Sequence, residues 1–261
     1  MTQSSLKQRI IAVCGKGGVG KTAFTAMLTR ALAESGRAGK LLLIDADPAL
    51  GLPGTVGITV ERTIGQVREA IIQTAKGGDA RAKQEVAGMV DYMVQEALAE
   101  TGTVALLAMG RTETMGCFCP VNNLLRDAID ILSKQFDTIV IDGEAGLEQI
   151  NRQVMRRVDT LLVLSDSSSR GLQTASVLKN MVEVEKIVQC ERTGLIVNRV
   201  QGNEDALIAA AARIGIELAG LIPQDPNITS FDAIGRALME LPSDSPALSA
   251  VRGIVDGYVL T

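Results

Sequence analysis

Residues 15–22, GKGGVGKT, have the types and spacing that most directly suggest chemistry. They fit the pattern G-x-x-x-x-G-K-[ST], with Gly15, Gly20, Lys21 and Thr22 at the fixed positions. In such a loop the backbone N–H groups turn inward around a polyphosphate, and the helix that follows adds positive partial charge. We therefore expect Lys21 to reach the β- and γ-phosphates of a nucleotide and the Thr22 hydroxyl to bind Mg²⁺.

A second candidate site is the cysteine pair Cys117 and Cys119, in the segment GCFCP. Because Cys119 precedes a proline, extended backbone is favoured there, and an extended segment would place both thiols on one side. Pro120 suits the first turn of a following helix, whose positive end favours thiolates. The sequence has no histidine, so a metal site must be built from thiolates, carboxylates or ligands of another molecule.

Two thiols are only half of a tetrahedral thiolate site, and a two-fold dimer would supply all four. The C-x-C spacing alone also fits a buried loop pair or a redox pair, so these alternatives stay open. Of the other two cysteines, Cys14 ends the first expected strand and is expected to be buried packing, whereas Cys190 is assigned no role.

Three aspartates follow apolar segments that are typical of strands. Asp45 and Asp47 lie in LLLIDADPALG, and Asp142 ends TIVID. Ligands of doubly wound sheets bind at the carboxyl ends of the strands, so these carboxylates are candidates for a nucleotide and magnesium site. Each of them alone could instead cap a turn or a helix.

The elements that must position these residues alternate in type along the sequence. Short apolar runs predict strands at 10–13, 41–44, 104–108, 138–141, 160–164, 194–197 and 218–222. Helical spacing predicts helices at 21–35, 62–75, 82–100 and 121–135. Strands that are apolar throughout and separated by helices favour a doubly wound, mostly parallel α/β sheet with helices on both faces. We expect residues 1–261 to form a single domain of this P-loop NTPase class.

The composition of the sequence argues against several classes of function. The 261 residues are 46% hydrophobic with a net charge of −4, and no apolar run approaches the length of a membrane span. The acidic balance argues against a nucleic-acid partner, and neither a membrane nor a secretory signal is indicated. Four cysteines in such a sequence do not suggest a disulfide framework. We expect a soluble, cytoplasmic protein.

The stretch KGGVGKT resembles the deviant Walker A loop of the ATPase group that includes MinD, ParA and the nitrogenase iron protein. This resemblance implies Mg²⁺-dependent hydrolysis of ATP to ADP in a nucleotide-dependent homodimer. It also implies that Lys16 crosses to the partner's nucleotide, comparable to an arginine finger. The implied nucleotide contacts in the loop are Gly15, Lys16, Gly17, Gly18, Val19, Gly20, Lys21 and Thr22.

The same resemblance assigns roles beyond the loop. It implies that Asp47 orients or activates the attacking water, that Asp45 is a supporting carboxylate, and that Asp142 holds Mg²⁺ through water. Residues 143–146 would be the second switch. Asn198 in GLIVNRV would read the adenine edge, with Arg199 beside it as a further candidate nucleotide contact, and the loop with Pro223 and Gln224 would pack the base.

With a C-x-C pair near the middle of the sequence, the protein looks like the CooC/AcsF-type maturation ATPases of carbon monoxide dehydrogenase and acetyl-CoA synthase. The similarity runs through GKGGVGKT, DADP, GCFCP, IDGEAGLE and VNRV in the same order. It implies that Cys117 and Cys119 bind Ni²⁺ or Zn²⁺ at the dimer interface and that hydrolysis drives nickel insertion into a client enzyme. One departure is Ala23, where many relatives carry a hydroxyl.

Three other functions fit parts of the sequence. An iron–sulfur electron or cluster carrier like the nitrogenase iron protein also shares a cluster between subunits, but its cysteines are far apart in sequence. A MinD/ParA-type positioning switch would favour a basic amphipathic tail, which residues 245–261 do not offer, or a basic face, against which the net charge of −4 argues. A small-molecule ligase or kinase of this fold would not need the C-x-C pair.

Overall fold

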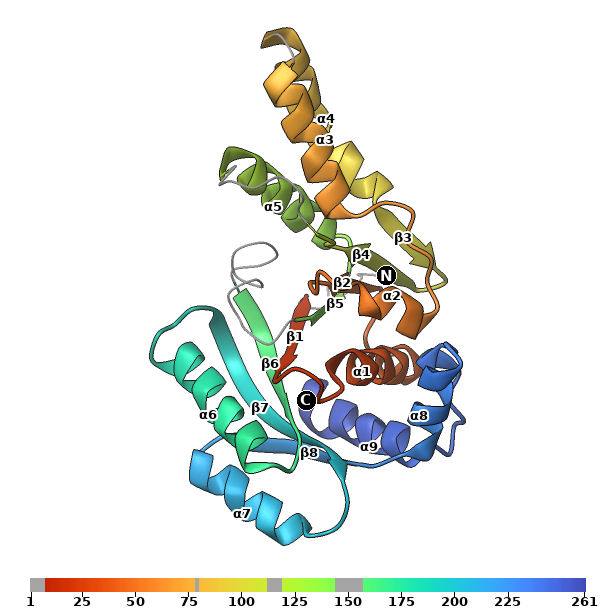
Figure 1. Ribbon diagram of the computed structural model, residues 1–261, viewed down its shortest axis with the longest axis vertical. Helices are drawn as coiled ribbons and strands as arrows, with labels where there is room; N and C mark the ends of the chain where they lie inside the picture. Colours follow the sequence, from red (N-terminus) through yellow and green to blue (C-terminus); the bar gives the residue numbers. More distant parts are fainter. Residues whose placement is uncertain (1–7, 78–79, 112–118, 144–156) are drawn as a thin grey trace, which may run out of the picture.

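The computed structural model describes residues 8–77, 80–111, 119–143 and 157–261. Within these residues the protein forms one eight-stranded sheet with the order β3-β4-β2-β5-β1-β6-β7-β8 (Figure 1). The strands are β1 (Arg9–Gly15), β2 (Leu41–Asp45), β3 (Leu98–Thr101), β4 (Val104–Ala108), β5 (Thr138–Asp142), β6 (Arg157–Ser165), β7 (Gln189–Val200) and β8 (Glu217–Pro223).

All neighbouring strands run parallel except β3, which pairs antiparallel with β4 at one edge. The sheet and its helices confirm the expected doubly wound, mostly parallel α/β class. The helices are α1 (Lys21–Ser35), α2 (Gly51–Val56), α3 (Ile64–Gly77), α4 (Ala80–Glu96), α5 (Cys119–Ser133), α6 (Ser169–Glu183), α7 (Glu204–Ile214), α8 (Pro226–Ala233) and α9 (Pro246–Ile254). Two short segments, η2 (Leu238–Glu240) and η3 (Val255–Val259), complete the described elements.

Alternating side chains of the central strand divide the interior into two cores. Ile11 and Val13 face the core under α1, α2 and α9, whereas Ala12 and Cys14 face the core under α3 to α7. All four side chains are fully buried, as the apolar run predicts for a strand covered on both faces. In Figure 1, α1 and α9 lie on one side of the sheet, and α5, α6 and α7 lie on the other.

The expected helix over 82–100 is wrong at its end. The helix stops at Glu96, and Leu98–Thr101 form the edge strand β3 instead. The turn into β4 contains Gly102, whose φ of 57° is left-handed and therefore suits glycine. This strand was not expected from the sequence because its apolar spacing continues that of the helix before it.

None of the helices in the described part of the protein is both long and apolar enough to cross a lipid bilayer.

Candidate nucleotide and metal site

The loop of residues 15–22 connects the end of β1 to the start of α1, as its pattern predicts. Two of its glycines are required by geometry. A Cβ on Gly15 would lie 2.0 Å from the Leu164 carbonyl oxygen of β6. Gly20 has a left-handed φ of 91° at the start of α1, and a Cβ there would lie 2.8 Å from the Asn198 amide nitrogen. Larger residues at these two positions would therefore displace the loop from the sheet.

The two lysines of the loop lie in different environments. The Lys21 Nζ donates to the Gly15 carbonyl at 3.1 Å and to the Lys16 carbonyl at 3.4 Å, so its ammonium group lies within the loop. The Lys16 side chain is 39% exposed and lies 3.7 Å from a carboxylate oxygen of Asp166. Exposed pairs of this kind contribute about 0–1 kcal/mol, so Lys16 can exchange this partner for another at little cost.

Asp166 follows the end of β6 and was not among the residues predicted from the sequence. Burial raises the pKa of its carboxyl group, but hydrogen bonds from Ser168 and the charge of Lys16 outweigh burial and lower it overall. The group is therefore ionised at neutral pH and attracts Lys16. The sequence could have indicated Asp166 by its position directly after an apolar strand, which is the pattern that identified Asp45 and Asp142.

Asp45 and Asp142 are brought together at the carboxyl edge of the sheet, where they are register partners of β2 and β5. Both are almost completely buried. Asp45 accepts the backbone N–H of Asp47 on one carboxylate oxygen and that of Leu52 on the other, each at 3.1 Å. One oxygen of Asp142 accepts the Thr25 hydroxyl at 3.1 Å, whereas its Oδ2 has no hydrogen-bond partner among the described residues.

Because of these different partners, the two carboxylates differ in what they can still bind. Asp45 already satisfies two backbone donors and so fixes the loop between β2 and α2. Asp142 presents a buried oxygen to which no described residue donates, and such an atom is stabilised by a cation or a water bound to one. The Asp142 position therefore fits Mg²⁺, with the Thr22 hydroxyl expected to contribute from the start of α1.

Burial also perturbs the acidity of both groups. It raises the pKa of Asp45 to about 7, against the N–H donors that favour the carboxylate. It raises the pKa of Asp142 to about 6, against the Thr22 and Thr25 hydroxyls and the charge of Lys21. Paired carboxylates with raised pKa values in a strand-end site are typical of functional positions.

We expect the magnesium-free protein to lose stability as the pH rises from about 5 to about 7.5. Both carboxyl groups have folded pKa values above the ~4 of unfolded aspartate, so the folded state binds more protons in this range. Their stabilising contribution is complete at low pH and is lost as the pH passes through the folded pKa values. Denaturant melts in EDTA should show a falling midpoint, and a midpoint that rose over this range would contradict the prediction.

Asp47 and the short helix α2 complete this edge of the site. The Asp47 side chain is half-buried and accepts the backbone N–H of Ala49 at 2.9 Å. A Cβ on Gly51, the first residue of α2, would lie 3.8 Å from the Thr22 hydroxyl oxygen, so this helix begins beside the phosphate loop. The helix α2 was not predicted from the sequence.

The predicted base-binding residues lie beyond the phosphate loop. The Asn198 amide donates to the Val19 carbonyl at 2.8 Å, and its oxygen accepts the N–H of Arg199 at 2.9 Å. The Arg199 guanidinium donates to the Gly18 carbonyl at 3.3 Å. In this arrangement both side chains hold the phosphate loop, and Asn198 would have to release Val19 to contact a base.

Pro223 and Gln224 lie where β8 leads into the next loop. Pro223 ends β8, and the Gln224 backbone N–H donates to the Val200 carbonyl at 3.2 Å. The Gln224 side chain accepts a hydrogen bond from Gln201. These contacts join the ends of β7 and β8, so Pro223 and Gln224 belong to the same edge as Asn198.

The cysteine site is described only in part. Cys117 and residues 144–146 of the expected second switch lie outside the described residues. Cys119 begins α5, so the expectation of extended backbone at Cys119 is wrong, while Pro120 does lie in the first helical turn. The proline keeps a helical φ there and has no N–H to satisfy. Within the described ranges, no cluster of three or more cysteine, aspartate or glutamate side chains could hold a metal ion.

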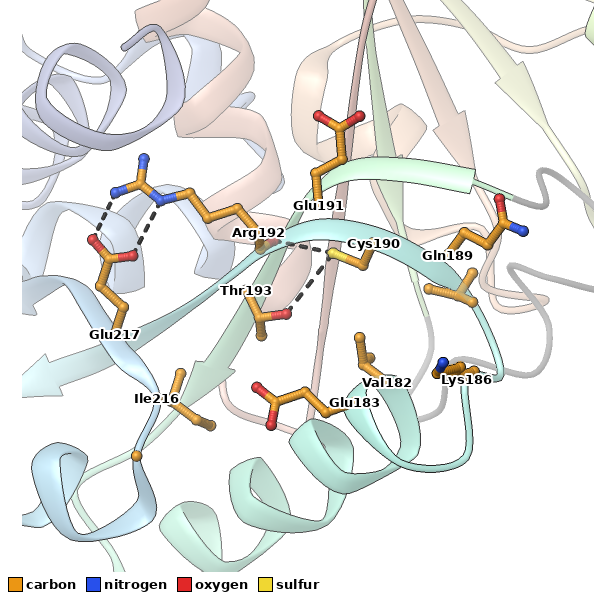
Figure 2. A pocket seen from close by; sticks show the side chains of 12 residues that line it. Val182, Glu183, Lys186, Gln189, Cys190, Glu191, Arg192, Thr193, Ile216 and Glu217 are labelled. Atoms are coloured by element: carbon orange, nitrogen blue, oxygen red, sulfur yellow. Dashed lines mark hydrogen bonds and ion pairs between the residues drawn. The ribbon is translucent and has the colours of Figure 1, made fainter.

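The remaining cysteines lie away from this loop. Cys14 is fully buried, which confirms the packing prediction, and burial raises its pKa to about 12. Cys190 lines a pocket of about 590 Å³ at the amino ends of β7 and β8, opposite the phosphate loop (Figure 2). In Figure 2 the Cys190 thiol points to Thr193 and to the Arg192 backbone, while Arg192 pairs with Glu217. The thiol and the Arg192 guanidinium thus have protein partners, and the pocket is separate from the nucleotide edge.

The sequence matches the family profile of an AAA domain over residues 8–193. It is 38% identical over 251 residues to an uncharacterized ATP-binding protein of Methanocaldococcus jannaschii, covering 96% of this protein and 98% of the relative. It is 30% identical over 247 residues to the carbon monoxide dehydrogenase accessory protein CooC of Rhodospirillum rubrum, covering 91% of this protein and 90% of the relative.

Solved structures show the same fold. The cell division protein MinD of Aquifex aeolicus superimposes with a TM-score of 0.69 at 21% identity, over 95% of both proteins. A ParA family ATPase of Chlorobium tepidum superimposes with a TM-score of 0.69 at 19% identity, over 95% of this protein and 97% of the ParA ATPase. At these identities the likeness concerns the fold.

Proposed function

This protein belongs to the AAA-domain family, and on that premise we propose that it is an ATP-hydrolysing metallochaperone for nickel. We infer that residues 1–261 act as a single ATPase domain that forms a homodimer with ATP. In this proposal a C-x-C pair from each subunit holds Ni²⁺ or Zn²⁺ between the subunits. Hydrolysis then changes the geometry of the metal site and delivers nickel to a client enzyme.

The geometry of the phosphate loop supports the nucleotide roles in this proposal. Residues 15–22 cradle the phosphates, and Lys21 moves from the loop carbonyls to the β- and γ-phosphates. Thr22 and Asp142 would hold Mg²⁺, and the bound ion would supply positive charge to the phosphate oxygens. The half-buried Asp47 orients the attacking water. Asp45 supports this position by fixing the backbone of Asp47 through its N–H.

The base would lie near Asn198, Arg199, Pro223 and Gln224. Because Asn198 and Arg199 already contact the loop carbonyls of Val19 and Gly18, binding of the base and order in the phosphate loop are linked. Adenine recognition by Asn198 then requires its amide to exchange partners. These four assignments derive from the family resemblance and from position at the same sheet edge.

The observation that carries the proposal is the coincidence of an available Lys16 with a C-x-C pair. Among the described residues, the side chain of Lys16 makes a weak ion pair with Asp166, which it can give up to serve a nucleotide of a second subunit. That assembly would bring two Cys117–Cys119 pairs together and complete four thiolate ligands. The similarity to CooC over nine-tenths of both proteins supports carbon monoxide dehydrogenase or acetyl-CoA synthase as the class of client.

The test is a Ni²⁺ and Zn²⁺ titration of the wild type and of the Cys117→Ser/Cys119→Ser variant, with and without a non-hydrolysable ATP analogue. We expect one metal ion per two wild-type subunits, and at least a hundredfold weaker binding in the double variant because it removes all four proposed thiolates. Cys190→Ser is the matched control and should bind like the wild type. Undiminished binding in the double variant would exclude the proposed site, and a brown chromophore after anaerobic purification would favour a cluster carrier.

A further inference from the structure

Arg68 of α3 is a charged side chain buried between helices. It is 6% exposed, and its Nε donates to the Asn122 side-chain oxygen of α5 at 2.9 Å. Its Nη1 donates to Glu69 at 2.9 Å. Burying an ion costs several kcal/mol unless it is well paired, so an apolar residue could fill this space more cheaply. What the arginine adds is a directed contact between α3 and α5.

The contact made by Arg68 is close to the candidate metal ligand. Asn122 lies three residues after Cys119, which is a rise of about 4.5 Å along a helix. Arg68 therefore holds the first turn of the helix that begins at Cys119. A movement of α3 would be transmitted to the backbone at this end of α5.

The start of α3, about one turn before Arg68, is seated on the nucleotide edge of the sheet. The backbone N–H of Gly65, in its first turn, donates to the Met109 carbonyl at 2.8 Å, and the Met109 N–H donates to the Asp45 carbonyl at 2.9 Å. A Cβ on Gly65 would lie 2.2 Å from the Arg111 carbonyl oxygen, so the helix is in tight contact there. The start of α3 is thus connected by two hydrogen bonds to the strand end that carries Asp45.

We propose that α3 couples the nucleotide site to the thiols, with Arg68 as the positioning residue that transmits the coupling to α5. The connection runs from Asp45 through Met109 and Gly65 to Arg68 and Asn122. In Figure 1, α3 extends from the sheet beside β4 and lies alongside α5. This inference rests on the proposed function, because it assumes that the thiols of α5 and its preceding loop hold the metal. Coupling between two sites is reciprocal, so bound metal would change nucleotide affinity by the same factor.

The test compares Zn²⁺ affinity in ADP with Zn²⁺ affinity in a non-hydrolysable ATP analogue. We expect the two affinities to differ roughly tenfold in the wild type, a common size for coupling between sites. In Arg68→Met the ratio should fall below twofold, with nucleotide affinity retained. Arg62→Met is the matched control, because Arg62 lies just before α3, pairs at the surface with Glu96 of α4 and should keep the wild-type ratio.

Asn122→Ala provides a second variant that breaks the same contact. Asn122 is exposed, so its replacement should leave the fold intact and still reduce the ratio. Arg68→Lys combined with Asn122→Asp should restore most of the ratio by replacing one polar contact with another. A ratio that stayed at the wild-type value in both Arg68→Met and Asn122→Ala would overturn the proposal.

Hydrogen exchange separates failure of this coupling from failure of the metal site. In metal-free wild-type protein, the ATP analogue should change the amide hydrogen-exchange rates of residues 123–127 of α5. In metal-free Asn122→Ala it should leave these rates unchanged. If the wild type bound no Zn²⁺ through its thiols, the proposed function would fail while this readout still tested the coupling. Equal changes in both proteins, or no change in either, would contradict the role of Arg68.

Discussion

Replacing Lys16 by glutamine should reduce ATP turnover about a thousandfold while leaving ATP affinity within severalfold of the wild type. A cation supplied across an interface to transferring phosphate contributes about 10³-fold or more to the rate. The Lys16 side chain is partly exposed, and its partner within the described residues is Asp166, at 3.7 Å. Steady-state kinetics would measure turnover, and equilibrium nucleotide binding would measure affinity. The mass of the protein in the presence of the ATP analogue would show whether it dimerises.

The Asp166→Asn variant distinguishes a cross-subunit role of Lys16 from an effect of losing the Lys16–Asp166 ion pair. The variant removes the same Lys16–Asp166 contact but keeps the lysine, so it should retain ATP-dependent dimerisation and turnover within severalfold. If Lys16→Gln and Asp166→Asn lost activity equally, Lys16 would act by ordering its own loop. If Lys16→Gln kept wild-type turnover, the cross-subunit role would be excluded.

Replacing Asp142 by asparagine should have opposite effects on activity and stability. Turnover should fall on the order of a hundredfold, because the Oδ2 carboxylate atom proposed to hold Mg²⁺ through water is lost. At pH 8 without magnesium, the variant should melt about 2–6 °C higher, because it removes a buried charge whose raised pKa of about 6 shows that ionisation opposes folding. Magnesium-dependent turnover and thermal melts in EDTA would check both.

The stability gain is limited by one compensating effect. The asparagine oxygen can still accept the Thr25 hydroxyl, but its NH₂ group replaces an oxygen that has no partner among the described residues, and a buried NH₂ group needs an acceptor. Thr25→Val serves as a control, because it removes a hydrogen bond to Asp142 without removing the charge and should lower the melting temperature. A lower melting temperature in Asp142→Asn than in the wild type would contradict the predicted gain in stability.

The phosphate loop was predictable because its geometry is set locally by glycine, lysine and a helix start. The strand ends were predictable for the same reason, since an apolar run that stops at an aspartate identifies the carboxyl edge. That Asp45 and Asp142 are direct neighbours was not predictable. It depends on the order of β2 and β5 in the sheet, which long-range packing determines.

Other features depended on contacts that the sequence does not display. Lys16 pairs with Asp166, which lies 150 residues later in the sequence and comes close only because β6 packs beside β1 in the sheet. The helix α2 was missed because GLPGTV contains two glycines and a proline, and its position is fixed by the Leu52 N–H bound to Asp45. The buried Arg68 has no distinctive local pattern, and only the packing of α3 on α5 reveals its contact.

Native mass spectrometry of the protein with Zn²⁺ or Ni²⁺ and a non-hydrolysable ATP analogue is the sharpest test of a metal site shared between two subunits. We expect an assembly of two subunits, two nucleotides and one metal ion, which dissociates to monomers in Lys16→Gln and loses only the metal in Cys117→Ser/Cys119→Ser. One metal bound to each single subunit, or a dimer that keeps its metal without the two cysteines, would contradict the shared site.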